Sequence, residues 1–386
     1  MDDQRPTTAA HAGADAVATP GGTVSGLSAI GSMPTDAEGR SVFAADELAI
    51  VLSHYRIGLI DTIKQFKRGS RKAPKLVIRS DRGLFLLKRR AHGRDDPFKV
   101  AFTHGIQLRL AEQRFPLPKL IGTRRENNSM VQYLGQVYEL FEFVRGTGYD
   151  RSVPATQDAG ATLAIFHTLL ADYKPHFKPP KGTYHAAPVV ASSLTVLTGA
   201  LMKPAEGEPT VSEQEADQLT DELDRCYNEA ADRVDELGIT QMPVQVGHSD
   251  WHPGNMLFNE RRVMAVIDYD AARLLPRVID IANGALQFSI QGKGEDTGRW
   301  PEQVDEDRYE AFFQGYTSIS GSELTQTEKQ TVPWLMIQAL IAESVIPVAA
   351  TGMFSNMNGA DFLKMVLRKI HWIQTNHAQL IEMIDA

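Results

Sequence analysis

Cysteine is almost absent from this 386-residue chain. Cys226 stands alone, so an intramolecular disulfide and a metal site built from several thiolates are both excluded. An excess of positive charge is missing too: the formal net charge is −8, which argues against nucleic acid or an anionic membrane surface as the main partner. This composition fits a reducing compartment, and we expect a cytoplasmic protein.

The chain has no uninterrupted apolar run long enough to span a membrane, and its N-terminal stretch has no aromatic residues. The best candidate for a membrane span, near the C-terminus, is interrupted by Glu343 and Pro347. The N-terminus lacks the basic region and apolar core of a secretory signal. No aromatic residue precedes Phe43, and the first stretch is rich in Ala, Gly, Thr, Ser and Pro. We therefore predict a disordered N-terminal tail over residues 1–42.

The remaining chain divides into two parts of different character. The order begins with a short helix within 43–55. Apolar stretches separated by turn residues then predict strands within 57–80, 82–90, 115–123 and 136–144, and a longer helix over 96–115. After residue 144 the pattern is mostly helical, with a short strand at 263–270. The prediction is an α+β fold of two lobes, a small β-rich lobe over 43–143 and a larger, mainly helical lobe over 144–386.

The most informative stretch is HSDWHPGNMLF, residues 248–258. His248, Asp250 and Asn255 have the spacing H-x-D-x-x-x-x-N of kinase catalytic loops, and Asp268 follows one strand later. Phosphoryl transfer needs a carboxylate that orients the attacking hydroxyl and accepts its proton, a task that suits Asp250. It also needs oxygen ligands for Mg²⁺, which Asn255 and Asp268 can supply.

A zinc hydrolase is the alternative reading of the same stretch. His248 and His252 are four residues apart, a spacing that chelates zinc when both lie on one helix. Pro253 and Gly254 follow at once and oppose a helix, and no Glu follows His248 as in an H-E-x-x-H motif. The metal-hydrolase hypothesis is therefore disfavoured.

HSDWHPGNMLF together with VIDYDAA resembles the superfamily of aminoglycoside phosphotransferases, choline kinases and homoserine kinases, whose fold is similar to that of protein kinases. The resemblance implies that Asp250 is the catalytic residue and that Asn255, Asp268 and Asp270 form the Mg²⁺ site. It also implies that His248 and Asp280 brace the loop. The absence of a long segment ending in an Ala-Pro-Glu-like motif after Asp268 disfavours a protein substrate.

The same resemblance implies an ATP site in the small lobe. Lys88, at the end of an apolar strand, would contact the α- and β-phosphates, and Ser70 would lie in the phosphate-covering loop. The adenine would bond to the backbone near Glu142 and Phe143.

One feature of the family is missing from the expected position. A glutamate on the small-lobe helix normally pairs with the strand lysine, whereas this helix offers Gln107 and His104, and Glu112 lies too close to the helix end. This departure keeps open a pseudokinase, or another nucleotide-binding scaffold on the same fold, as the alternative function.

The leading hypothesis is an ATP- and Mg²⁺-dependent phosphotransferase acting on a hydroxyl of a small molecule. Homoserine, a sugar, an amino alcohol and an aminoglycoside all remain open as the acceptor. Candidate acceptor contacts are Trp334, Glu343 and Tyr316, and an acidic pocket there would favour a cationic acceptor. The sequence leaves the oligomeric state open.

Overall fold

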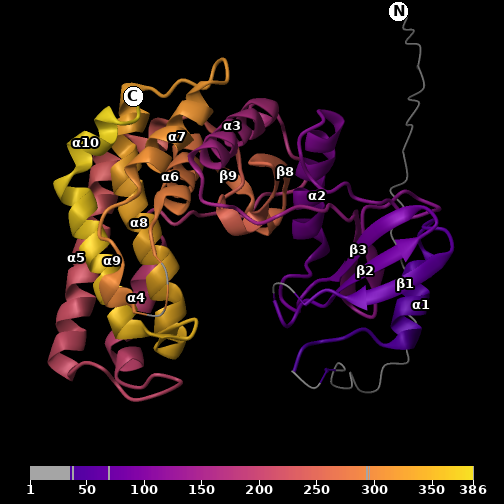
Figure 1. The fold of residues 1–386 in the computed structure, drawn as a ribbon. Coiled ribbons are helices and arrows are strands. Elements are labelled where there is room, and N and C mark those ends of the chain that lie inside the picture. The colour runs from indigo at the N-terminus through magenta and orange to yellow at the C-terminus, as the bar shows by residue number, and fades with distance from the viewer. Residues whose placement is uncertain (1–34, 37–38, 68–69, 293, 295, 386) are drawn as a thin grey trace, which may run out of the picture.

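The computed structural model describes residues 35–36, 39–67, 70–292, 294 and 296–385. Most of the predicted tail lies outside these residues. The described part of it contacts the small lobe, since the N–H of Ser41 donates to the carbonyl of Arg71 and the carbonyl of Val42 accepts from the Arg89 guanidinium. Figure 1 shows the two predicted lobes, with the small lobe in indigo and purple.

The small lobe is built on one antiparallel sheet with the strand order β1-β2-β3-β5-β4. The strands are β1 (Ile60–Gln65), β2 (Lys75–Ser80), β3 (Gly83–Arg89), β4 (Val131–Tyr133) and β5 (Gln136–Glu142). Alternation along β3 buries Phe85 and Leu87 on one face of the sheet, which leaves Lys88 on the other face. On β5, Glu139 lies directly opposite Lys88.

Two α-helices accompany this sheet in the sequence, and they pack in the cores of different lobes. Helix α1 (Ala45–Ser53) buries Val51 in the small-lobe core. Helix α2 (Pro97–Glu112) begins at Asp96, whose carboxylate accepts the N–H of Phe98 at 2.9 Å. Its apolar side chains Phe102, Ile106 and Leu110 belong instead to the core of the large lobe. Helix α2 therefore joins the two lobes.

The strand predicted at residues 115–123 is wrong. The segment forms only an isolated bridge, between Leu120 and Phe141. Pro116 and Pro118 have no N–H to donate, so the segment cannot sustain a ladder along its length.

The large lobe is mainly helical, as predicted. Its helices are α3 (Val153–Leu170), α4 (Pro188–Leu201), α5 (Glu213–Glu236), α6 (Arg277–Ser289), α7 (Glu306–Thr317), α8 (Gln326–Thr351), α9 (Gly359–Thr375) and α10 (His377–Glu382). Helix α4 was not predicted. Where α3 crosses α7, a Cβ on Gly160 would lie 2.0 Å from the carbonyl oxygen of Phe312. The two helices can approach this closely because glycine has no side chain there.

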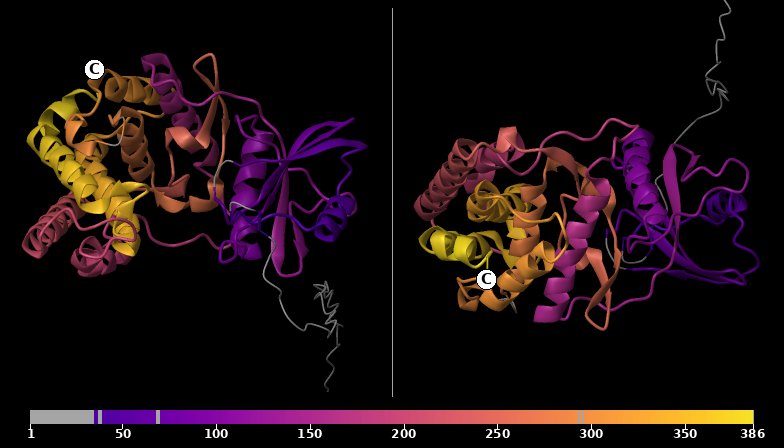
Figure 2. Two further views of the ribbon diagram at one scale, coloured as in Figure 1. Left: turned by 60° about the horizontal axis from the view of Figure 1, so that its bottom comes forward. Right: turned by 90° about the horizontal axis from the view of Figure 1, so that it is seen from above.

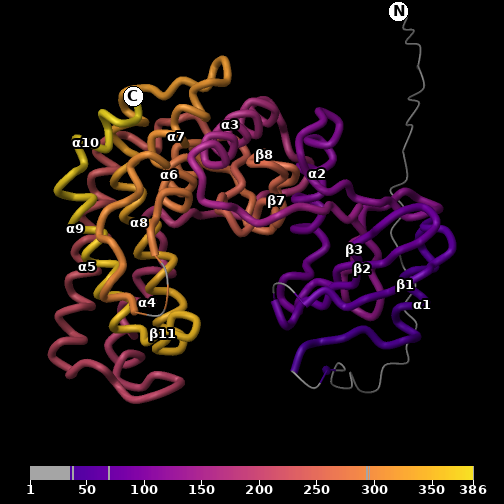
Figure 3. The backbone as a smooth tube through the Cα atoms, in the orientation of Figure 1, coloured from indigo at the N-terminus to yellow at the C-terminus, as the bar shows by residue number. Residues whose placement is uncertain are grey.

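Two small antiparallel sheets of two strands each lie where the large lobe faces the small one. Strand β6 (Val244–Gly247) pairs with β9 (Arg273–Pro276), and β7 (Met256–Asn259) pairs with β8 (Arg262–Val266). Figure 3 shows β7 and β8 beside α2, and both views of Figure 2 keep this region between the two lobes. A third pair, β10 (Met353–Phe354) and β11 (Met357–Asn358), connects α8 to α9.

Helix α8 is the central helix of the large lobe. It continues through Pro333 and Pro347, so Pro347 does not end it. Its length and composition would allow it to cross a membrane, but 72% of its most apolar window is buried inside the fold. Helices α4, α5, α6 and α9 pack around it, which gives it the environment of a core helix.

Candidate active site

A cleft of about 450 Å³ lies between the lobes. From the small lobe it is lined by Lys75, Lys88, Arg90, Gln107 and Glu139, and from the large lobe by Asn255, Asp268 and Asp270. The connection between the lobes, residues 142–146, forms a further wall. The structure thus brings most of the residues singled out in the sequence to one cleft.

Asp250 lies on the loop after β6, beside this cleft. Its Oδ2 accepts a hydrogen bond from Asn255 Nδ2 at 2.7 Å, and His252 Nε2 lies 3.6 Å from its Oδ1. The side chain is 41% exposed, so a substrate can reach it. Burial acts to raise the pKa of Asp250, but the bond to His252 and the nearby charge outweigh it, and the pKa is lowered. The carboxylate is therefore ionised at neutral pH.

Asp280, in the first turn of α6, is hydrogen-bonded to the backbone of this loop. Its two carboxylate oxygens accept the backbone N–H groups of His248 and Ser249 at 2.6 and 2.7 Å. His167 Nε2 on α3 lies 3.2 Å from the same carboxylate. Ser249 has a φ of 63°, a left-handed conformation that a non-glycine residue rarely adopts, and these bonds stabilise it.

His248 is completely buried and is not among the residues that line the cleft. Its Nε2 donates to the carbonyl of Ile267 at 3.3 Å, and its ring packs against Trp251 and Tyr269. Burial lowers its pKa, which favours the neutral ring. This contact joins the loop of Asp250 to the segment that carries Asp268. One ring nitrogen of each histidine is engaged by the backbone, since His248 Nε2 bonds to Ile267 and His252 Nδ1 accepts the N–H of Gly254 at 3.0 Å, so the arrangement gives the zinc hypothesis no support.

Asp268 and Asp270 are differently engaged, although both line the cleft. Asp268 has a φ of 63° and begins a 3-10 turn over Tyr269–Ala271. Asp270 is paired with two cations of the small lobe: Lys88 Nζ lies 3.4 Å away and Arg90 donates to it at 2.8 Å. Helix α6 begins soon after, at Arg277, so the long activation segment of protein kinases is absent from this described stretch.

Glu139 is the site residue that the sequence reasoning missed. It is fully buried, and its Oε2 lies 3.9 Å from Lys88 Nζ. A lone acid inside the apolar run Val137–Phe141 is unusual for a buried strand, and that signal could have revealed it. No acid of helix α2 is paired with Lys88 in the described part of the chain, but Lys88 does have carboxylate partners in Glu139 and Asp270.

The predicted nucleotide contacts are only partly brought to the cleft. Glu142 and Phe143 line it, but their N–H groups already donate to the carbonyls of Lys119 and Leu84. Of the backbone groups of these two residues, only the carbonyl oxygens therefore remain available to bond an adenine base. Ser70 does not line the cleft: its hydroxyl accepts the N–H of Lys72 at 3.2 Å, which closes a local turn.

Of the three candidate acceptor contacts, Glu343 lies near the loop of Asp250, since the charges of Asp250 and His252 act on it. It lies on α8, where Gln287 of α6 donates a hydrogen bond to it. The protein atoms around the carboxyl group and the charge of Asp250 raise its pKa to about 7, although the residue as a whole is exposed to solvent. Tyr316 is completely buried and bonded to His167, and Trp334 packs on His377 at 5.8 Å. Tyr316 as an acceptor contact is therefore wrong.

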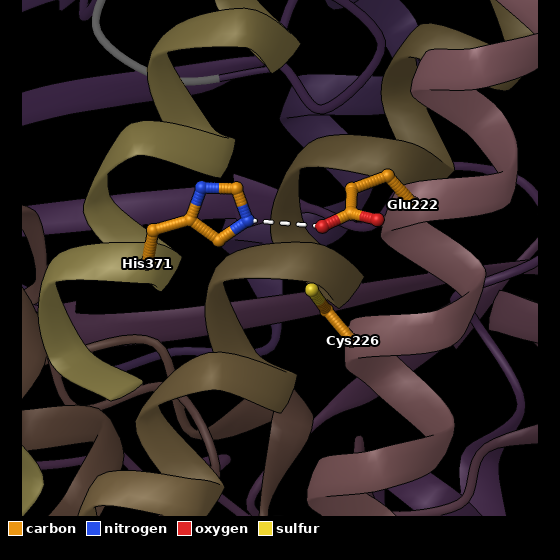
Figure 4. A group of neighbouring side chains, drawn as sticks. All are labelled: Glu222, Cys226 and His371. Carbon is orange, nitrogen blue, oxygen red and sulfur yellow. Dashed lines mark hydrogen bonds and ion pairs between the residues drawn. The ribbon is translucent and has the colours of Figure 1, made fainter. Parts of the chain in front are cut away.

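A second cluster of potential metal ligands lies far from the cleft, between α5 and α9. Figure 4 shows Glu222, Cys226 and His371, with His371 Nε2 3.0 Å from Glu222 Oε1. Arg225 already forms two hydrogen bonds with the same carboxylate, at 2.6 and 3.1 Å. Burial raises the pKa of Cys226 to about 11, so the thiol is neutral. Ion pairing between helices accounts for this cluster, and we assign no metal to it.

Residues 62–325, more than half of the chain, match the phosphotransferase enzyme family, APH. The chain belongs to this family. The predicted resemblance is confirmed, and with it the class of small-molecule phosphotransferases. No curated protein matches the sequence.

Solved structures confirm the kinase-like fold at low sequence identity. An aminoglycoside phosphotransferase from Alicyclobacillus acidocaldarius is 17% identical with a TM-score of 0.64, over 90% of this chain and 98% of that one. Amicoumacin kinase hAmiN, in complex with AMP-PNP, Ca²⁺ and Ami, is 12% identical with a TM-score of 0.61, over 86% and 94%. A microcompartment-associated aminopropanol kinase is 13% identical with a TM-score of 0.60, over 85% and 96%.

Proposed function

We propose that this phosphotransferase moves the γ-phosphoryl group of ATP, with Mg²⁺, to a hydroxyl of a small molecule that carries a positive charge. One observation carries the proposal: Lys88, Asn255 and Asp268 line a single cleft, beside which Asp250 is hydrogen-bonded to Asn255. A cytoplasmic location, expected from the sequence, is part of the proposal.

In the proposed reaction Asp250 is the catalytic residue. It orients the acceptor hydroxyl and accepts its proton while the oxygen attacks the γ-phosphorus. The bond from that phosphorus to the β–γ bridging oxygen breaks, and ADP leaves. The bond from Asn255 Nδ2 fixes the carboxylate, and the chemistry depends mainly on positioning and charge neutralisation.

The proposed Mg²⁺ ligands are Asn255 and Asp268. The Nδ2 of Asn255 is already bonded to Asp250, which leaves its Oδ1 for a cation. Carboxylate and amide oxygens are the ligands that Mg²⁺ prefers, so these two side chains fit the ion. When bound, Mg²⁺ supplies positive charge to the β- and γ-phosphates. Asp270 is paired with Lys88 and Arg90, and we assign it to holding those cations rather than to the metal.

On the nucleotide side, the proposal assigns Lys88 to the phosphates and adds Lys75, which lines the same cleft. Burial, and then the charge of Lys88, lower the pKa of Lys75, an effect that a phosphate between the two lysines would oppose. The adenine would use a backbone carbonyl of Glu142 or Phe143 and the N–H of Val144. Ser70 stays a prediction, because only movement of its loop would bring it to the phosphates.

Glu343 supports a cationic acceptor. Together with Asp250 it adds negative charge to the acceptor side of the loop, and this charge raises its own pKa. An ammonium group beside it would relieve that repulsion. Amino alcohols and aminoglycosides carry both a hydroxyl and an amine, and two of the similar structures are named for such acceptors, aminopropanol and aminoglycosides.

The deciding experiment measures ADP release with ATP and Mg²⁺ against a panel of hydroxyl compounds, with and without an amine. We expect release that depends on one amine-bearing acceptor. Asp250→Asn should reduce kcat about a hundredfold or more. Calorimetry should show that this variant binds Mg·ADP as tightly as the wild type. Nucleotide binding without release for any acceptor would instead support a pseudokinase.

A further inference from the structure

Two carboxylates lie near Lys88 Nζ: Asp270 of the large lobe, at 3.4 Å, and Glu139 on the neighbouring strand of the small lobe. Lys88 on β3 and Glu139 on β5 are directly opposite each other in the antiparallel ladder, and Lys88 Nζ lies 3.9 Å from Glu139 Oε2. Helix α2 passes the same site, where it presents Gln107 to the cleft. The position at which the family resemblance implies an acid is therefore occupied by an amide.

Glu139 is held as an ion in spite of its complete burial. Arg90 donates two hydrogen bonds to it, both at 2.9 Å, and His104 Nε2 donates to its Oε1 at 2.7 Å. Burial alone would raise the pKa of Glu139, but Lys88, the bond from His104 and the charge of Arg90 hold it well below its usual range. A buried carboxylate with three cationic or polar partners has a fixed orientation.

His104 connects this carboxylate to α2. Its Nδ1 lies 2.8 Å from the Ser129 hydroxyl, which fixes the ring, and its Nε2 reaches Glu139. Helix α2 is anchored by Phe102 and Ile106 in the core of the large lobe. His104 is thus a contact between the small-lobe sheet and a helix that packs with the large lobe.

We propose that Glu139 is the small-lobe positioning residue for Lys88 in this protein, alongside Asp270 of the large lobe, and that His104 replaces the direct contact between α2 and the lysine. This inference rests on the proposed nucleotide site. Because Lys88 and Glu139 belong to one hydrogen-bonded sheet, their pairing does not depend on where α2 lies. A shift of α2 changes the bond from His104, while Lys88 keeps its carboxylate.

The test moves the acid from the strand to the helix. Glu139→Gln should weaken Mg·ADP binding, measured by calorimetry, about tenfold, as expected when a ligand loses the partner that orients it. The KM for ATP should rise and the KM for the acceptor should not. Adding Gln107→Glu to this variant returns a carboxylate to the cleft that Lys88 also lines and should restore most of the affinity. Glu112→Gln, at the exposed end of α2, is the matched control and should change neither value.

Several outcomes would overturn the inference. A folded Glu139→Gln protein with unchanged nucleotide affinity would do so. A loss of affinity that Gln107→Glu does not restore would also overturn it, because the effect of Glu139→Gln would then come from the lost ion pair with Arg90 and not from Lys88. If Glu139→Gln does not fold, Glu139→Asp keeps the charge but withdraws it from Lys88 by one methylene, and unchanged affinity there would contradict the inference. Binding is measured without an acceptor, so it is independent of whether transfer occurs; a wild-type protein that binds no nucleotide would refute the proposed nucleotide site itself.

Discussion

The carboxylate of Asp280 accepts the backbone N–H of His248 at 2.6 Å, and through this bond α6 fixes the loop that carries Asp250. Asp280 is fully buried and also accepts the N–H of Ser249. Asp280→Asn replaces one acceptor oxygen with a donor, so one buried N–H loses its partner. We expect the free energy of unfolding to fall by about 1–3 kcal/mol.

The same substitution should affect the reaction more than nucleotide binding. A displaced Asp250 lowers kcat by roughly ten- to a hundredfold, because transfer depends on its position. The affinity for Mg·ADP should change little, since Lys88 is held elsewhere. Asp224→Asn, on the exposed side of α5, is the control. An Asp280→Asn protein with wild-type kcat would refute the role of Asp280 as a support.

Much of the site could be predicted because its groups are close in sequence. Asp250, Asn255 and Asp268 lie on one loop and one short hairpin, so their spacing alone carries the chemistry. Lys88 likewise could be singled out because it stands at the end of an apolar strand that is continuous in the sequence. Such patterns need no knowledge of distant parts of the chain.

The contacts that were missed join residues far apart in sequence. Glu139 and Lys88 are 51 positions apart, and only the strand order β3-β5 makes them neighbours. Tyr316 looked available to an acceptor, yet it is bonded to His167 in the core between α3 and α7. Periodicity and spacing contain no information about such pairings.

Asp268 and Asp270 should differ in their effect on the metal. If Asp268 binds Mg²⁺, Asp268→Asn removes a charged ligand, and the Mg²⁺ concentration for half-maximal activity should rise about tenfold or more. Asp270→Asn removes the partner of Lys88 and Arg90, so it should raise the KM for ATP with a smaller change in Mg²⁺ dependence. Activity titrated with Mg²⁺ at saturating ATP distinguishes them. Equal shifts in both variants would place Asp270 in the metal site, as the sequence had suggested.

The crossing of α3 and α7 should not tolerate a methyl group. A Cβ on Gly160 would lie 2.0 Å from the carbonyl oxygen of Phe312, and one on Gly315 would lie 1.8 Å from that of Gln157. Gly160→Ala should destabilise the protein by about 1–3 kcal/mol, because the helices must separate. Gly199 on α4 has no neighbour within 4 Å of such a Cβ, and Gly199→Ala should stabilise by up to about 1 kcal/mol. Urea denaturation of the two variants measures this contrast, and a neutral Gly160→Ala would contradict the close crossing.

The ionisation of Glu343 should control acceptor binding near neutral pH. Burial and Asp250 raise its pKa to about 7, so its proton is lost as the pH rises through that value. A cationic acceptor binds the ionised form, and its KM should therefore fall as the pH rises. Between about pH 6 and pH 8 the decrease should be roughly tenfold, because at the lower pH most of Glu343 is protonated. The KM for ATP should not follow this profile.

Glu343→Gln removes the ionisation and isolates its contribution. In this variant the acceptor KM should be high and nearly independent of pH over the same range, while kcat at saturating acceptor changes less. A neutral acceptor with the same hydroxyl provides the second comparison, since its KM in the wild-type protein should not fall with rising pH. Initial rates at several acceptor concentrations and pH values give all these constants. If the KM of the cationic acceptor keeps its pH dependence after Glu343→Gln, another group binds the ammonium, and Asp250 is the next carboxylate to examine because its charge already acts on Glu343.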